Sequence, residues 1–135
     1  MRHYAVLDTN VLVSALLNPK SIPGEVLRQA LLGDIIPLYD ERIIQEYNEV
    51  LHREKFHFDH ARVRGLLEEY VRCGRYIEAA PVEDEMFLDT DDIAFYEVAF
   101  EEQKEDAWLV TGNLKHYPIK SFVVTPRQML DILKK

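Results

Sequence analysis

Three acidic side chains from distant parts of the sequence have types and positions that suit metal-dependent chemistry on phosphates. Asp8 directly follows an apolar run at residues 3–7, and Asp92 lies in the first turn of a predicted helix. Glu46 lies on another predicted helix, beside Val50 at the edge of its apolar face. Converging carboxylates repel one another unless a cation or protons neutralise them, and oxygen-rich sites suit Mg²⁺ or Mn²⁺. Such ions activate water and stabilise an in-line displacement at phosphorus, so these residues predict a divalent-metal site.

Each acid also has an ordinary structural explanation. Asp8 could cap a helix, and Glu46 could extend from the edge of its helix into water. Asp92 is harder to explain as a cap, because at about 100° per residue it projects from the middle of an apolar face. We expect that face to carry Ile93, Phe95, Tyr96, Ala99 and Phe100.

A hydroxyl and an amide follow another apolar run, at residues 107–111. Thr111 ends this run, and Gly112 and Asn113 come next. A simple Gly-Asn turn explains the last two residues equally well. If the run is a strand of the same sheet as residues 3–7, Thr111 and Asn113 lie at the edge where Asp8 lies.

The positions of these residues depend on an alternation of strands and helices. Apolar runs predict strands at residues 3–7, 35–39, 76–79, 107–111 and 122–125. Apolar periodicity and capping residues predict helices at residues 11–17, 23–32, 40–53, 59–73, 91–103 and 126–133. This alternation predicts an α/β fold with three α/β/α layers and a mainly parallel central sheet of four to five strands. Ligands of such sheets bind beyond the carboxyl ends of the strands, where the three acids would meet.

Length and composition indicate one soluble, cytoplasmic domain over residues 1–135. No repeat or flexible linker divides the 135 residues, and 47% of them are hydrophobic. The longest stretch without a charge, residues 9–19, is shorter than the roughly 18–20 residues that cross a bilayer. The single cysteine, Cys73, excludes an internal disulfide framework and a cysteine-based zinc site.

The net charge of −8 at first argues against a nucleic-acid ligand, but the charge is unevenly distributed. Residues 78–106 hold 12 acids and one base, Lys104, while the rest of the chain is net +3. Apolar residues interrupt this acidic block, which indicates a folded segment rather than a disordered tail. The charge distribution therefore leaves room for RNA.

Four segments, YAVLDTNVLVSAL, IIPLYDERIIQEYNEVL, LDTDDIAFYEVAFEEQKEDAWLVTGNLKHYP and SFVVTPRQML, follow one another in the chain. In order and total length they resemble the PIN-domain (PilT N-terminal) family, in particular its VapC-like toxin-type ribonucleases. The resemblance implies a metal-dependent endoribonuclease, with Asp8, Glu46 and Asp92 as catalytic and metal-binding acids. It implies polar support from Asn10 and Thr111.

The resemblance also implies a toxin that is inhibited by a small antitoxin protein and that is often a homodimer. One position departs from the family pattern, because Asn113 stands where many members have a fourth acid. An amide oxygen can still ligate Mg²⁺ or Mn²⁺ without supplying charge, which leaves the number of bound ions open. Asp89 or Asp91 could supply the missing charge.

Basic side chains would contact the RNA backbone. The candidates are Lys115, His116 and Lys120, just past the predicted site. A second group of bases is formed by Arg53, Lys55, Arg62 and Arg64. For both groups an ordinary solvated surface is the alternative.

Two other functions stay open from the residues alone. A PIN-like scaffold with an impaired site could serve as a binding module, which Asn113 would favour. A phosphotransferase could use Asp8 as its nucleophile, but haloacid-dehalogenase-like enzymes need a second Asp where this chain has Asn10.

Overall fold

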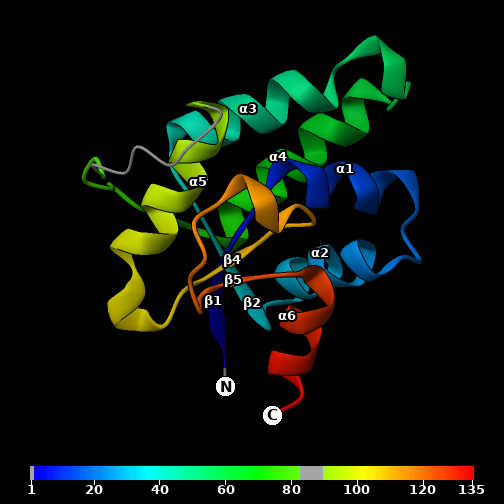
Figure 1. Ribbon diagram of the computed structural model, residues 1–135. Helices are drawn as coiled ribbons and strands as arrows, with labels where there is room; N and C mark the ends of the chain where they lie inside the picture. Colours follow the sequence, from blue (N-terminus) through cyan, green and yellow to red (C-terminus); the bar gives the residue numbers. More distant parts are fainter. Residues whose placement is uncertain (1, 83–89) are drawn as a thin grey trace.

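The computed structural model describes residues 2–82 and 90–135, and a five-stranded, fully parallel sheet lies at its centre (Figure 1). The strand order is β3-β2-β1-β4-β5. The strands are β1 (His3–Leu7), β2 (Ile35–Tyr39), β3 (Arg75–Tyr76), β4 (Trp108–Val110) and β5 (Val123–Val124). Because β1 is the central strand, its carboxyl end lies between the carboxyl ends of β2 and β4. The predicted parallel sheet is confirmed.

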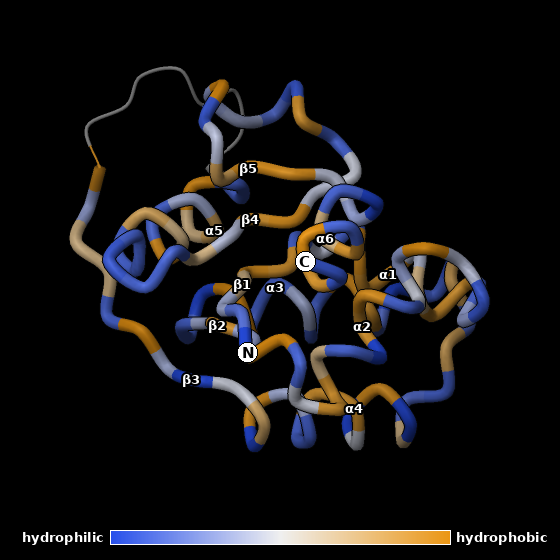
Figure 2. Tube along the Cα trace, turned by 90° about the horizontal axis from the view of Figure 1, so that it is seen from below, coloured by the Kyte–Doolittle hydropathy of each residue, from blue (hydrophilic) through white to orange (hydrophobic). Residues whose placement is uncertain are grey.

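Helices cover both faces of this sheet, as the three-layer prediction requires. The described helices are α1 (Thr9–Leu17), α2 (Ile22–Leu32), α3 (Glu41–Leu51), α4 (His60–Cys73), α5 (Thr90–Glu101) and α6 (Pro126–Leu133). Helix α5 packs on one face against β1, β2 and β4, and α2 and α4 pack on the other face (Figure 2). Helices α1 and α6 pack on α2, and α3 contacts α1, α4 and α5. None of the described helices is long and apolar enough to cross a membrane.

Side-chain caps begin most of these helices close to the predicted positions. Asp8, Ser21, Asp40 and Asp59 accept backbone N–H bonds at the starts of α1, α2, α3 and α4. Each cap accepts a hydrogen bond from an N–H that has no partner within the first turn of the helix. The capping residue therefore determines where the helix begins.

The strand predicted at residues 76–79 has other bounds, and the apolar face predicted for the helix at residues 91–103 is wrong. The strand predicted at residues 76–79 is β3, which begins at Arg75 and ends at Tyr76. Beyond it, the backbone N–H groups of Ala80 and Val82 donate to side chains of α5, to Glu101 at 2.9 Å and Glu97 at 2.7 Å. Phe100, expected in the buried face of α5, is 50% exposed and stacks on Tyr96. The buried residues of α5 therefore do not lie on the one helix face that the apolar periodicity predicted.

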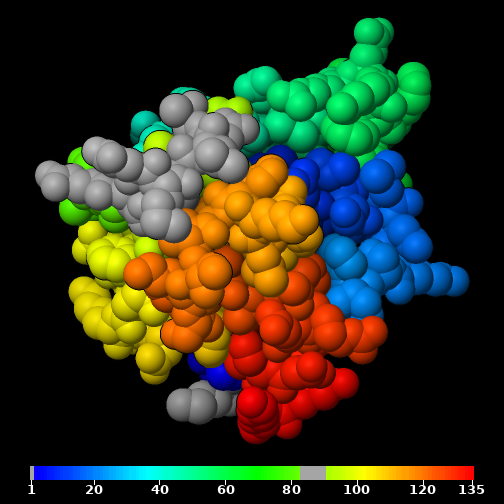
Figure 3. All heavy atoms as spheres, viewed as in Figure 1, coloured from blue at the N-terminus to red at the C-terminus, as the bar shows by residue number. Residues whose placement is uncertain are grey.

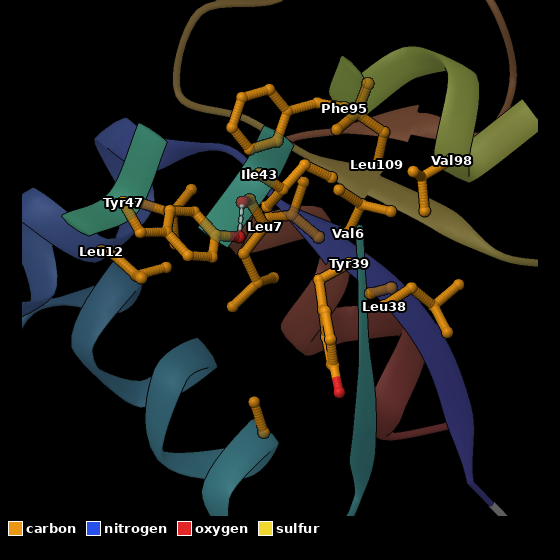
Figure 4. Close-up of a cluster of buried hydrophobic side chains, with 14 of the residues drawn as sticks. Val6, Leu7, Leu12, Leu38, Tyr39, Ile43, Tyr47, Phe95, Val98 and Leu109 are labelled. Atoms are coloured by element: carbon orange, nitrogen blue, oxygen red, sulfur yellow. Dashed lines mark hydrogen bonds between the residues drawn. The ribbon is translucent and has the colours of Figure 1, made fainter. Parts of the chain in front are cut away.

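The core attaches α3 to the end of β1. Val6 and Leu7 of β1 are fully buried among Ile43 and Tyr47 of α3 and Phe95 of α5 (Figure 4). The Tyr47 hydroxyl donates a hydrogen bond to the Leu7 carbonyl, drawn as the dashed line in Figure 4. Burial raises the pKa of Tyr47 well above its ordinary value, so this hydroxyl keeps its proton. This bond holds Tyr47, which follows Glu46 in α3, against Leu7, which precedes Asp8.

Candidate active site

Asp8 lies at the carboxyl end of the central strand and is 4% exposed. Its Oδ2 accepts hydrogen bonds from Thr111 Oγ1 at 2.7 Å and from the Tyr117 hydroxyl at 3.3 Å. Its Oδ1 lies 3.4 Å from the backbone N of Asn10, whose own side chain is exposed. The carboxylate is therefore oriented mainly through one oxygen, by residues that follow β4.

Asp92 comes to the same place from the first turn of α5. Its Oδ1 lies 3.5 Å from the Tyr117 hydroxyl, and its Oδ2 lies 3.4 Å from His116 Nδ1. The Asp92 side chain is 13% exposed. The structure thus brings Asp8 and Asp92 within reach of one hydroxyl group.

The turn after β4 supplies the polar groups around these two acids. Thr111 is fully buried, and its Oγ1 accepts from the backbone N of Asn113 at 3.0 Å. The Asn113 side-chain amide nitrogen lies 2.9 Å from His116 Nε2. The 3-10 turn Leu114–His116 then returns the chain so that Tyr117 faces Asp8.

Sequence reasoning missed Tyr117. The ring is 6% exposed, so the side chain resembles an ordinary buried tyrosine in any local pattern. Burial raises the pKa of Tyr117 well above its ordinary value, and the charges of Asp8 and Asp92 raise it further. Tyr117 is therefore a permanent proton donor at neutral pH. The one sequence feature that could have indicated a role for Tyr117 is its position in the segment that follows Thr111 and Asn113.

Glu46 lies beside this pair rather than in hydrogen-bond contact with it. It is half-buried and lines a pocket of about 420 Å³ between α3 and α5, together with Asp91. Burial raises the pKa of Glu46, and the negative charges of Asp91, Glu49 and Asp8 raise it further, while Arg53 lowers it. Asp91 is exposed, and Asp89 lies outside the described residues.

The donor chemistry of this region fits a hard divalent cation. Asp8, Glu46 and Asp92 offer carboxylate oxygens and Asn113 offers an amide oxygen, the ligand types that Mg²⁺ and Mn²⁺ take. Burial is the main cause of the raised pKa of Glu46, and the nearby negative charges of Asp91, Glu49 and Asp8, which a cation would offset, raise it further. Within residues 2–82 and 90–135, however, no three Asp, Glu, His or Cys side chains stand close enough together to share one ion. Glu46 would have to turn toward Asp8 and Asp92 to join them.

A basic residue that the sequence analysis missed lines the pocket beside Glu46. Arg42 donates through Nε to Asp40 Oδ2 at 2.8 Å and through Nη1 to Glu97 Oε1 at 2.6 Å. The Asp40 and Glu97 side chains are 9% and 6% exposed, whereas that of Arg42 is 49% exposed. This ion-pair cluster joins the start of α3 to the middle of α5.

The predicted RNA-contacting bases lie on the surface beyond the site. Lys115 and Lys120 are exposed, and His116 is 41% exposed and faces Asp92. The segment after β4 is visible at the centre of the face shown in Figure 3. In the second group of bases, Arg53 pairs with Glu49 at 3.1 Å and Lys55 lies over the Phe56 ring.

Comparisons with known proteins agree with this fold. A sequence model described as a PIN domain matches residues 4–115. The crystal structure of PAE2754 from Pyrobaculum aerophilum superposes with a TM-score of 0.60 over 98% of this chain and 90% of that one. The two sequences are 15% identical, so this likeness shows the fold. None of the curated proteins that were compared matches the chain.

Proposed function

Since the chain belongs to the PIN-domain family, whose members are generally metal-dependent nucleases, we propose that it is a divalent-metal-dependent endoribonuclease. One observation carries the proposal: Asp8 and Asp92, separated widely in sequence, meet through Tyr117 at the carboxyl edge of the sheet. Glu46 and Asp91 border this edge in a pocket between two helices. Such a concentration of acids is costly in a fold unless it serves to bind a cation.

The residues divide into three roles. Asp8, Glu46 and Asp92 would hold Mg²⁺ or Mn²⁺, with Asn113 as a neutral ligand and Asp91 as an additional acid. When bound, the cation supplies charge stabilisation to the phosphodiester and activates the attacking water. Thr111 holds Asp8 in place, and the backbone N–H of Asn10 contacts its other oxygen. Lys115, His116 and Lys120 would bind RNA phosphates next to the cleaved bond.

We further propose that the protein is the toxin of a toxin–antitoxin pair and acts on RNA in the cytoplasm, as one nuclease unit of residues 1–135 that can form a homodimer. A surface groove of about 590 Å³ supports a protein partner. It is largely apolar and lies among residues of α1, α2 and α4, and the exposed side chains of Leu17 and Leu32 come from the same helices. The product of a neighbouring open reading frame should bind the purified protein and suppress RNA cleavage. If no neighbouring product does so, the protein is a solitary nuclease.

The decisive test compares the wild type with Asp8→Asn on an RNA substrate in Mn²⁺ or Mg²⁺. We expect cleavage by the wild type, loss of cleavage in chelator, and a decrease of at least about 100-fold in the variant. Glu68→Gln is the control, because Glu68 is an exposed acid on α4 that does not line the pocket holding Glu46 and Asp91. Circular dichroism shows whether both variants fold.

Three results would contradict the proposal in different ways. Equal activity of wild type and Asp8→Asn would mean that the site is wrong. Wild type that neither cleaves RNA nor binds Mn²⁺ would favour a binding module, which is the function that Asn113 leaves open. A phosphoryl group bound covalently to Asp8 would favour a phosphotransferase.

A further inference from the structure

We propose that Tyr117 is a positioning residue that orients Asp8 and Asp92 for cation binding, an inference that rests on the proposed function. The Tyr117 hydroxyl lies 3.3 Å from Asp8 Oδ2 and 3.5 Å from Asp92 Oδ1. Both distances exceed the roughly 2.7–2.8 Å typical of O–H···O bonds, as expected when one proton lies between two acceptors. The hydroxyl thus supplies a neutral link between two carboxylates that would otherwise repel each other.

The pattern of donors around Asp8 indicates what this link does. Thr111 and Tyr117 both donate to Oδ2, and Thr111 makes the shorter bond at 2.7 Å. The contact to Oδ1 is the longer one, 3.4 Å from the backbone N of Asn10. Two hydroxyls therefore hold the carboxylate by Oδ2 and leave Oδ1 with only the longer contact to the Asn10 backbone. Outer hydrogen bonds of this kind fix the orientation of metal-binding side chains.

The Asp92 carboxylate is contacted by His116 as well as by the Tyr117 hydroxyl. Oδ1 faces Tyr117 and Oδ2 faces His116, so the carboxylate plane is held from both sides. Tyr117 is itself fixed, because its ring is 6% exposed and follows directly on the Leu114–His116 turn. A rigid ring between two acids from different elements sets their separation in a way that neither strand β1 nor helix α5 does alone.

The test is Tyr117→Phe, which retains the buried ring and removes only the hydroxyl. We expect the Mn²⁺ dissociation constant, measured by calorimetry, to rise about 10- to 100-fold. In RNA cleavage, the Mn²⁺ concentration for half-maximal rate should rise by the same factor. The KM for RNA should stay unchanged, and saturating Mn²⁺ should restore kcat.

Tyr39→Phe is the matched control. Tyr39 is 8% exposed, and its hydroxyl donates to the Val71 carbonyl of α4 at 3.0 Å rather than to either acid. Both variants remove only the hydroxyl of a buried tyrosine, so a merely structural role would lower thermal stability in both and leave Mn²⁺ affinity unchanged.

The outcomes separate this inference from the proposed function. If the wild type binds Mn²⁺ and Tyr117→Phe binds it with the same affinity, the positioning role is overturned while the nuclease proposal stands. Tighter binding by the variant would also overturn it, because the hydroxyl would then compete with the cation. If the wild type binds no Mn²⁺, the proposed function itself fails.

Discussion

Glu46 shows most clearly how single residues of the site are affected by their surroundings. Its carboxyl is half-buried and faces the negative charge of Asp91 across a pocket. Both effects disfavour ionisation, so the pKa of Glu46 in the folded protein is above its ordinary value. In the unfolded chain the same group ionises freely. Ionised Glu46 therefore lowers the stability of the cation-free fold.

We accordingly expect Glu46→Gln to raise the melting temperature at pH 7 in chelator. The sign follows from linkage: the cost of the carboxylate begins as pH rises through the ordinary Glu pKa of about 4.3 and is complete above the raised folded-state value. Below the ordinary value both side chains are neutral, so the difference should disappear. Melting curves from acid to neutral pH, with Glu68→Gln as control, measure this.

Added Mn²⁺ should reverse the effect of Glu46→Gln. A ligand that binds only the folded state stabilises it according to its concentration and affinity, so the wild type should gain more than the variant. If Glu46→Gln instead lowers the melting temperature in chelator at every pH, the carboxylate has a stabilising partner and our interpretation of its raised pKa is wrong.

At the scale of elements, helices α3 and α5 carry two of the three predicted acids and are joined by side chains. Arg42 at the start of α3 pairs with Asp40 and with Glu97 in the middle of α5. The other oxygen of Glu97 accepts the backbone N–H of Val82. Glu97 therefore connects α5 both to α3 and to the chain that follows β3, which sets the width of the pocket holding Glu46.

Replacing Arg42 with Ala should destabilise the protein by about 1–3 kcal/mol. Loss of one partner from a buried ion pair costs about 3–5 kcal/mol, and the smaller value applies because half of the Arg42 side chain is already solvated. Urea denaturation measures the change. Arg28→Ala is the control, because its pair with Glu25 is exposed and contributes about 0–1 kcal/mol. Equal shifts in the two variants would show that the Arg42 cluster does not join the helices.

At the scale of the whole molecule, the net charge of −8 conceals opposite surfaces. The acidic residues 78–106 include Asp91 and Asp92 at the site, while the segment after β4 presents exposed Lys115 and Lys120. An RNA strand that reaches the acids would pass these bases. The distribution of charge rather than its sum decides whether a polyanion can approach.

Replacing Lys115 and Lys120 together with Ala should weaken RNA binding and reduce its salt dependence. Each lost phosphate contact removes about 0.7 from the slope of log affinity against log salt, so about 1.4 is expected for the pair. Binding is measured in the Asp8→Asn background to prevent cleavage. Lys134→Ala with Lys135→Ala is the matched control, since it changes the net charge equally at the chain end opposite α3 (Figure 1). If both double variants reduce the salt dependence of RNA affinity equally, RNA binds no particular face of the protein.

The features that could be predicted from the sequence lie within single elements. Apolar periodicity and capping residues act over a few positions, and they predicted the parallel sheet, most helix limits and the edge where Asp8 and Asp92 lie. The predicted roles of Asp8, Glu46 and Asp92 as metal ligands stay predictions. The features that could not be predicted depend on contacts between distant elements. Tyr117 reaches Asp8 across 109 positions, and Arg42 reaches Glu97 across 55. No local pattern specifies such partners, because they are selected when helices and turns pack on the sheet.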